Sequence, residues 1–165
     1  MEEENIRNFY DISVEFCNYI KQTVISKNKI EDLIEKLMDL YMHGMKLPLP
    51  TTIDLSNGKF DYSALPEINV TIDFDDSFRA MENPLDVEEE VAEKYCLSEL
   101  LTSIGRKLMA GISMYDSGYE KKAIFEWTTM LALTLGASIT DAIRALHSFR
   151  TEYALTEWID NLSGK

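Results

Sequence analysis

The most chemically suggestive residues in this sequence are those at 73–77, which have the order Asp-Phe-Asp-Asp-Ser. Alternating carboxylates of this kind resemble the opening of an EF-hand calcium loop. Such a loop also needs a glycine at its sixth position and a glutamate at its twelfth. Phe78 and Pro84 occupy those positions. The segment therefore does not predict an EF-hand, and only a weak, nonspecific cation site remains as a hypothesis.

The two histidines and two cysteines of the chain form no recognisable ligand set. His43 falls opposite the apolar stripe of its helix, and His147 falls at the border of another apolar face, where a packed, hydrogen-bonded histidine is expected. Cys17 lies on an apolar stripe, whereas Cys96 precedes a helix start, which can lower the pKa of a thiol. No H-E-x-x-H, C-x-x-C, nucleophile-elbow or glycine-rich phosphate-binding pattern occurs. We therefore predict no metal, no cofactor and no catalytic residue.

The charge of the chain limits its partners. Among its 165 residues are 29 acidic and 16 basic side chains, for a net charge of −13, and residues 61–100 alone carry twelve acids and two bases. No basic cluster exists that could displace counterions from phosphates, so we predict no nucleic-acid binding. The acidic residues either form a solvated surface that keeps the protein soluble, or form a face that binds a basic partner or a divalent cation.

The chain shows no sequence signal for export or membrane insertion. Its start, Met-Glu-Glu-Glu, is unlike a signal peptide, and no apolar run approaches the roughly 18 residues that span a bilayer. Two cysteines are too few for a disulfide framework and suit a reducing compartment. We therefore expect an acidic cytoplasmic protein without a membrane partner.

Apolar residues at helical spacing predict an N-terminal hairpin of two helices, over 5–26 and 29–46, that ends at Pro48 and Pro50. The periodicity is then lost from 51 to 86, where Asn57-Gly58 indicates a turn and 68–74 alternates like a half-buried strand. Because no partner strand is evident, we expect 68–74 to be extended and packed rather than part of a sheet. An acidic helix is expected at 87–94.

Three further helices are predicted in the C-terminal part, over 97–117, 119–135 and 139–161. Gly136 resembles a helix stop, and Ser138 with Asp141 resembles a new N-cap. The sequence thus predicts an all-α single domain over residues 1–165, with five main helices. The N-terminal hairpin packs on a three-helix C-terminal unit, and a long, irregular acidic connection joins the two.

The stretch Ala-Ile-Phe-Glu-Trp at 123–127, followed by Gly136 and by Asp-Ala-Ile-Arg-Ala-Leu-His at 141–147, resembles the signature of the bacterial family called domain of unknown function 5063. Leu-Met-Asp-Leu-Tyr at 37–41, with Leu-Pro at 47–48, is similar to the end of that family's N-terminal hairpin. The resemblance implies a small, helical bacterial protein and does not imply any activity. The family pattern has histidines where this chain has Thr134 and Ser138, and a tryptophan at Leu135.

These observations favour a non-enzymatic binding or protein-interaction module, with a protein partner or a second copy of the chain as its target. The alternative is a small-ligand enzyme or hydrolase with a polar pocket near Trp127, Arg144 and His147. Its candidate binding residues are Glu126, Trp127, Arg144, His147 and Arg150.

Arg150 carries a hypothesis of its own, because at 100° per residue it falls inside the apolar stripe of the last helix. A guanidinium at such a position either extends along the apolar surface until it reaches water, or is buried and must pair with a carboxylate. The hypothesis is that Arg150 is largely buried and pairs with an acid from another segment, such as 61–99. Arg150→Ala should then cost about 3–5 kcal/mol, whereas Arg144→Ala should cost under about 1 kcal/mol as the loss of an exposed charge.

Overall fold

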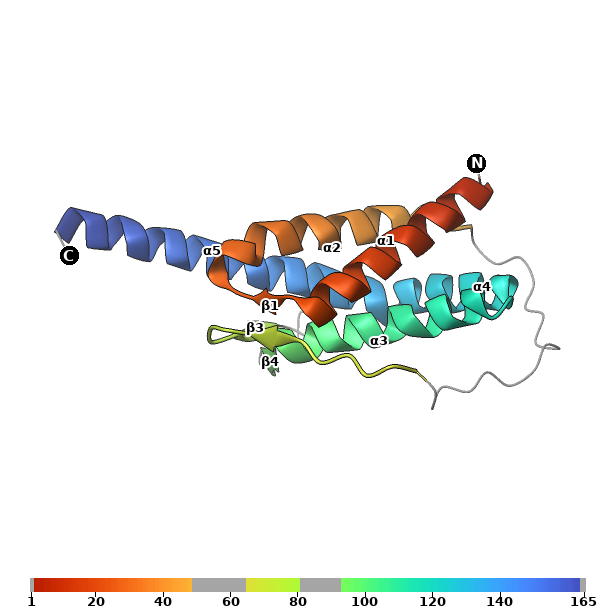
Figure 1. Ribbon diagram of the computed structural model, residues 1–165. Helices are drawn as coiled ribbons and strands as arrows, with labels where there is room; N and C mark the ends of the chain where they lie inside the picture. Colours follow the sequence, from red (N-terminus) through yellow and green to blue (C-terminus); the bar gives the residue numbers. More distant parts are fainter. Residues whose placement is uncertain (1, 49–64, 81–92, 164–165) are drawn as a thin grey trace.

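The computed structural model describes residues 2–48, 65–80 and 93–163, and these are mostly helical (Figure 1). The main helices are α1 (Glu2–Gln22), α2 (Ile30–Gly44), α3 (Leu97–Asp116), α4 (Glu120–Met130) and α5 (Gly136–Ser163). The short elements are the strands β1 (Val24–Ile25), β2 (Thr71–Ile72), β3 (Ser77–Ala80) and β4 (Glu93–Cys96), a 3-10 helix η1 (Lys27–Lys29) and a π-helical segment η3 (Leu131–Leu135). The prediction of a mainly α-helical protein is confirmed.

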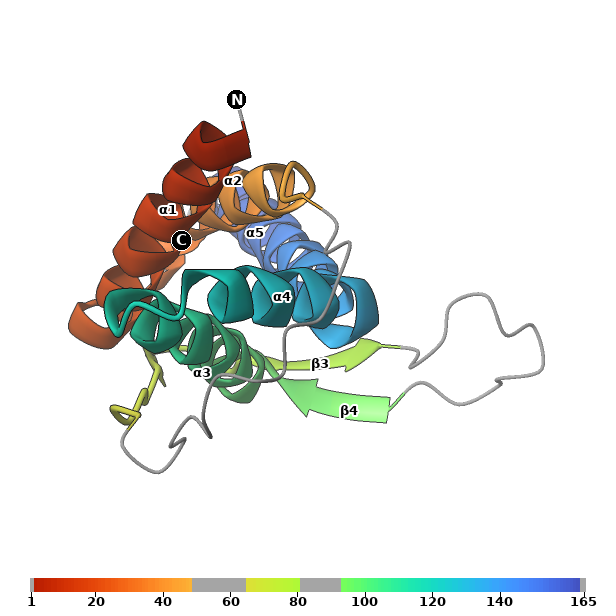
Figure 2. The same cartoon turned by 90° about the vertical axis from the view of Figure 1, so that its right-hand side faces the viewer.

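The N-terminal hairpin forms as predicted, although its first helix is shorter at its C-terminal end. α1 ends at Gln22 rather than near 26, because Val24 and Ile25 leave the helix to form β1. The polar residues Ser26, Lys27 and Asn28, which separate the two helices in the sequence, enter the 3-10 turn that leads into α2. α1 packs on both α2 and α3, while α2 packs on α5, so the hairpin covers the C-terminal helices (Figure 2).

The prediction of separate fourth and fifth helices is wrong, because α4, η3 and α5 form one continuous helix from Glu120 to Ser163. Gly136 does not stop the helix: its φ of −59° and ψ of −46° are helical, and its N–H donates to the carbonyl of Leu131. That bond spans five residues, as in a π-helix. A Cβ at Gly136 would lie 2.6 Å from the Leu131 oxygen. Glycine at 136 therefore accommodates the π-helical turn instead of ending the helix.

The expectation that 68–74 lacks a ladder partner is also wrong. β2 pairs in parallel with β1, with Ile25 opposite Ile72, and the Asp73 N–H donates to the Ile25 carbonyl oxygen at 3.1 Å. β3 pairs antiparallel with β4. The partner strand β1 contains only two residues and directly follows a helix, so the helical periodicity obscured it. The predicted turn at 57–58 and most of the predicted helix at 87–94 lie outside the described residues, but Glu93 and Lys94 are in β4.

One hydrophobic core joins the helices, and burial of its aliphatic and aromatic side chains stabilises the fold. α3 contributes to its centre, because this helix contacts α1, α4 and α5. The largest fully buried side chains include Trp127, Phe9, Phe16, Ile20, Leu33, Leu37, Leu40, Leu97 and Leu101. α5 extends beyond this core, and its last turns project away from the other helices (Figure 1).

The continuous helix at 120–163 corrects one further expectation. By length and composition alone it is long and apolar enough to cross a membrane, and 22% of its most apolar window is buried inside the protein. One helix of this kind is weak evidence for a membrane span.

Candidate functional site

The structure does not form the polar pocket that was predicted around Trp127, Arg144 and His147. The Trp127 side chain is fully buried, forms an edge contact with Phe9 at a centroid distance of 5.3 Å, and donates from Nε1 to the Leu108 carbonyl at 3.4 Å. Arg144 follows seventeen residues later on the same continuous helix, about 25 Å along its axis. These residues therefore cannot share one small-ligand pocket.

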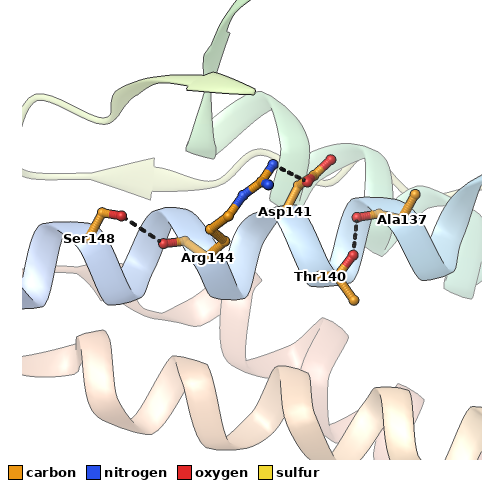
Figure 3. A network of polar contacts seen from close by, with 5 residues as sticks. All are labelled: Ala137, Thr140, Asp141, Arg144 and Ser148. Carbon is orange, nitrogen blue, oxygen red and sulfur yellow. Dashed lines mark hydrogen bonds and ion pairs between the residues drawn. The ribbon is translucent and has the colours of Figure 1, made fainter. Parts of the chain in front are cut away.

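The other predicted binding residues are also separate. Glu126 is half-buried beside the core tryptophan, and desolvation raises the pKa of its carboxyl despite the nearby Lys122. Arg144 is exposed and pairs within its own helix with Asp141 at 2.8 Å (Figure 3). His147 is exposed, contrary to the expectation of a packed histidine.

Arg150 is not buried, so that expectation is wrong. Its side chain is 54% exposed, and its Nε lies 3.0 Å from Oε1 of Glu31, which is 71% exposed. The partner does come from another segment, but from α2 rather than from 61–99. The helical phase of Arg150 places it at the border of the buried face, next to α2, where a long side chain reaches water at the edge of the bundle.

A pocket of about 390 Å³ lies where the segment between β2 and β3 meets α5 and η1. Its lining combines three carboxylates with three aromatic rings, together with one lysine and one serine: Asp73, Asp75, Glu152, Phe74, Phe149, Tyr153, Lys27 and Ser77. The rings form one cluster, because Phe74 lies 5.5 Å from Phe149 and 5.8 Å from Tyr153 between centroids. The pocket therefore offers aromatic surfaces together with negative charge.

A positive charge already occupies part of this pocket. The Nζ atom of Lys27 lies 4.1 Å from the centroid of the Tyr153 ring, which is the geometry of a cation–π contact. The carboxylates act on the same ring: burial first, and then the charges of Glu152, Asp75 and Asp73, raise the pKa of the Tyr153 hydroxyl. The neighbourhood therefore disfavours an additional negative charge and favours a cation.

The five residues at 73–77 divide between this pocket and the fold. Asp75 accepts a hydrogen bond from the Ser77 N–H at 3.1 Å, and this bond lowers the pKa of its carboxyl. Asp76 instead caps α3, because its Oδ2 accepts from the Ser98 N–H at 2.7 Å and its carbonyl accepts from the Leu97 N–H at 3.0 Å. The side chain and the backbone carbonyl of Asp76 thus satisfy the N–H groups of the first two residues of α3, which follows its N-cap residue Cys96.

Within residues 2–48, 65–80 and 93–163, no group of three or more histidine, cysteine or acidic side chains is arranged to hold a metal ion. The sequence pattern indicated the acidic segment, but it did not indicate the aromatic residues Phe149 and Tyr153 or the cation of Lys27 as part of a site. Phe149 and Tyr153 are four residues apart on one helix face, which is a periodic signal, but nothing in the sequence placed that face beside residue 74.

A second hollow of about 610 Å³ runs along α3. It is lined by Arg106 and Lys107 but also by Glu99, together with Asn69, Val70, Ser98, Thr102 and Ser103. Burial lowers the pKa of Lys107. Because both signs of charge line this hollow, it does not favour one class of ligand as the acidic aromatic pocket does.

Comparison with known proteins agrees with this architecture. A crystal structure of protein BF1032 from Bacteroides fragilis matches with a TM-score of 0.65 at 18% identity, over 88% of this chain and 95% of that chain, which is a likeness of fold. No curated protein matches the chain. The family model described as domain of unknown function (DUF5063) matches residues 1–152, most of the chain. The protein therefore belongs to the DUF5063 family.

Proposed function

We propose that this protein is a non-enzymatic interaction module that binds a cationic side chain, lysine or arginine, of a partner protein in the acidic aromatic pocket. The observation that carries the proposal is the ammonium group of Lys27, which lies 4.1 Å above the Tyr153 ring inside a pocket bordered by three carboxylates. The position of the chain's own lysine supports the choice of a cationic side chain as the ligand.

The charge of the whole chain supports this choice of partner. With a net charge of −13, the protein attracts basic surfaces over long distances, and its field raises the rate of encounter with them. At the pocket, a cation gains from the ring faces and from the carboxylates together. An organic cation suits this lining better than a metal ion, because the acids border the rings and form no ligand group among the described residues.

The enzyme hypothesis has less support. Its proposed residues are distributed along a single helix, with Trp127 in the core and Arg144 and His147 on the surface. A cytoplasmic location remains part of the proposal, since a reducing compartment suits the free thiols of Cys17 and Cys96.

The first test compares two lysines of the same 3-10 helix. A short peptide rich in lysine and arginine serves as the probe in calorimetric titration, with an acidic peptide of the same length as the probe control. Lys27→Ala should raise the affinity severalfold, because it removes the internal competitor. Lys29→Ala changes the net charge equally, but its exposed lysine has no ring contact among the described residues. It should raise the affinity only slightly.

The second test removes the ring under the cation. Tyr153→Leu should weaken peptide binding roughly fivefold or more, the range of a cation–π contact. Tyr119→Leu, at a tyrosine that is 40% exposed at the start of α4, is the matched control. Absence of binding by both the wild type and Lys27→Ala, or equal affinities for Tyr153→Leu and its control, would overturn the proposal.

A further inference from the structure

The last turns of α5 carry an apolar stripe that faces away from the protein's own core. Leu155, Trp158, Ile159 and Leu162 are 55%, 61%, 56% and 70% exposed. At 100° per residue these four side chains fall within about 60° of Leu155. Tyr153, which packs on Phe74, lies about 160° around the helix from Leu155. The stripe is therefore not a continuation of the face of α5 that packs on the core.

As a result, the apolar and polar faces of α5 exchange sides after Tyr153. Up to Tyr153, apolar residues face the bundle and polar residues face water. Beyond it, Glu157 and Asp160 continue the line of the core face, while the apolar side chains continue the solvent face. A helix end with this pattern has no partner among the described helices, and the family match ends at residue 152, before the stripe begins.

The same outward face continues back along α5 with small or polar side chains. Ala137, Arg144, Ser148 and Thr151 are all exposed and lie within about 40° of the direction of Leu155. The stretch from Trp127 to Thr140 contains no charged residue, and Leu133 within it is 71% exposed. One helix thus presents large apolar residues at the C-terminal end of a face, and toward the other end it presents an uncharged surface that includes Ala137 and the exposed Leu133.

We infer that this face binds the same face of a second copy of the chain, with the two α5 helices antiparallel and Ser148 near the twofold axis. In this register, Ile159 lies level with Ala137 of the second copy, eleven residues from the axis on either side. Large side chains then meet small ones, which is how helix surfaces interdigitate. Arg144 lies level with Glu152 of the second copy, so opposite charges meet twice across the twofold axis.

The area needed for a stable dimer favours this long contact over a contact between the projecting ends alone. A specific interface buries about 1,000 Å² or more in total. Two short helix ends fall below that value, whereas residues 133–162 extend for about 45 Å along each helix. A reciprocal contact also covers both apolar stripes, which a monomer leaves exposed to water.

The test uses the full chain and measures its mass in solution by sedimentation equilibrium. The wild type should have twice the mass of the chain at micromolar concentration. Ile159→Asp should weaken the association at least tenfold by placing a charge in the apolar contact. Asn161→Asp adds the same charge two residues away, about 120° around the helix from Leu155 and outside the stripe, and it should leave the association nearly unchanged.

Charge reversal tests the register. Arg144→Glu should weaken the dimer, and the double variant Arg144→Glu with Glu152→Arg should restore it. A monomeric wild type would overturn the inference, and so would a dimer that is insensitive to Ile159→Asp. A monomer that instead binds phosphatidylcholine vesicles through Trp158, detected by tryptophan fluorescence, would also overturn it in favour of a lipid surface.

Discussion

The two thiols of the chain differ in how far water can reach them. Cys17 is 1% exposed, and its Sγ–H donates to the Gly105 carbonyl at 3.7 Å. Burial raises the pKa of the Cys17 thiol to about 12, so the reactive thiolate is nearly absent at neutral pH. Cys96 is half-buried at the start of α3.

Thiol titration without denaturant should therefore label Cys96 first and leave Cys17 unreacted until the protein unfolds. Mass spectrometry of the labelled peptides identifies the site, and labelling in denaturant provides the full count of two. Equal rates at both positions in the native protein would contradict the burial of Cys17.

Arg150 and Arg144 now lead to the same expected effect on stability. Each is more than half exposed and pairs with one carboxylate, Glu31 for Arg150 and Asp141 for Arg144. Exposed pairs contribute roughly 0–1 kcal/mol, because water screens the charges. Alanine at either position should therefore reduce the free energy of unfolding by under about 1 kcal/mol in denaturant melts. A loss near 3 kcal/mol for Arg150→Ala alone would support the original hypothesis of a buried charge.

At the scale of elements, the π-helical segment determines how α4 continues into α5. The N–H of Gly136 donates to the carbonyl of Leu131, five residues earlier. The extra residue shifts the phase of everything that follows it. Gly136 is adjacent to both the Leu131 oxygen and the Tyr41 ring of α2, so this turn is also where the long helix contacts the hairpin.

Gly136→Ala should destabilise the protein by roughly 1–3 kcal/mol, the range for a side chain forced into a packed site. In an ordinary helix interior the same change stabilises by about 1 kcal/mol. The sign of the change in thermal or denaturant stability is therefore the measurement. Ala137→Gly, at an exposed neighbouring position, should lose about 1 kcal/mol from helix propensity alone. A more stable Gly136→Ala variant would show that the π-helical turn is dispensable.

At the scale of the whole molecule, self-repulsion accompanies a net charge of −13. The four ion pairs between described residues each include at least one side chain that is more than 40% exposed. Such exposed pairs contribute little to stability, so the loss of their attraction when salt screens them is small. Raising the ionic strength from about 0.01 M to about 0.1 M shortens the screening length from roughly 30 Å to 10 Å.

The melting temperature should therefore rise over this range of sodium chloride at fixed protein concentration. An uncharged osmolyte series at matched osmolality controls for solvent effects that do not act through charge. A falling melting temperature would mean that attractive ion pairs outweigh the repulsion.

Several features of the protein were predictable from the sequence alone. The hydrophobic stripes at 6–20, 30–45 and 97–115 predicted three helices, because a 3.6-residue period survives any tertiary arrangement. The positive φ of Gly118, at 82°, matches the predicted end of the third helix. Family membership was also visible, since motif residues keep their spacing in the chain whatever their contacts are.

Other features of the fold and of the pocket were determined only by the tertiary structure. β1 and β2 pair although 46 residues separate Ile25 from Ile72, and no local pattern specifies such a pairing. Glycine is typical of the end of a helix, yet Gly136 stays helical because the contacts of the helices on either side of it hold the chain in place. Arg150 lies at the border of the core face, and its exposure depends on where α2 begins, because its partner Glu31 is in the first turn of that helix. The acidic aromatic pocket likewise exists only because packing brings Phe74 against Phe149 and Tyr153, and Lys27 over the tyrosine ring.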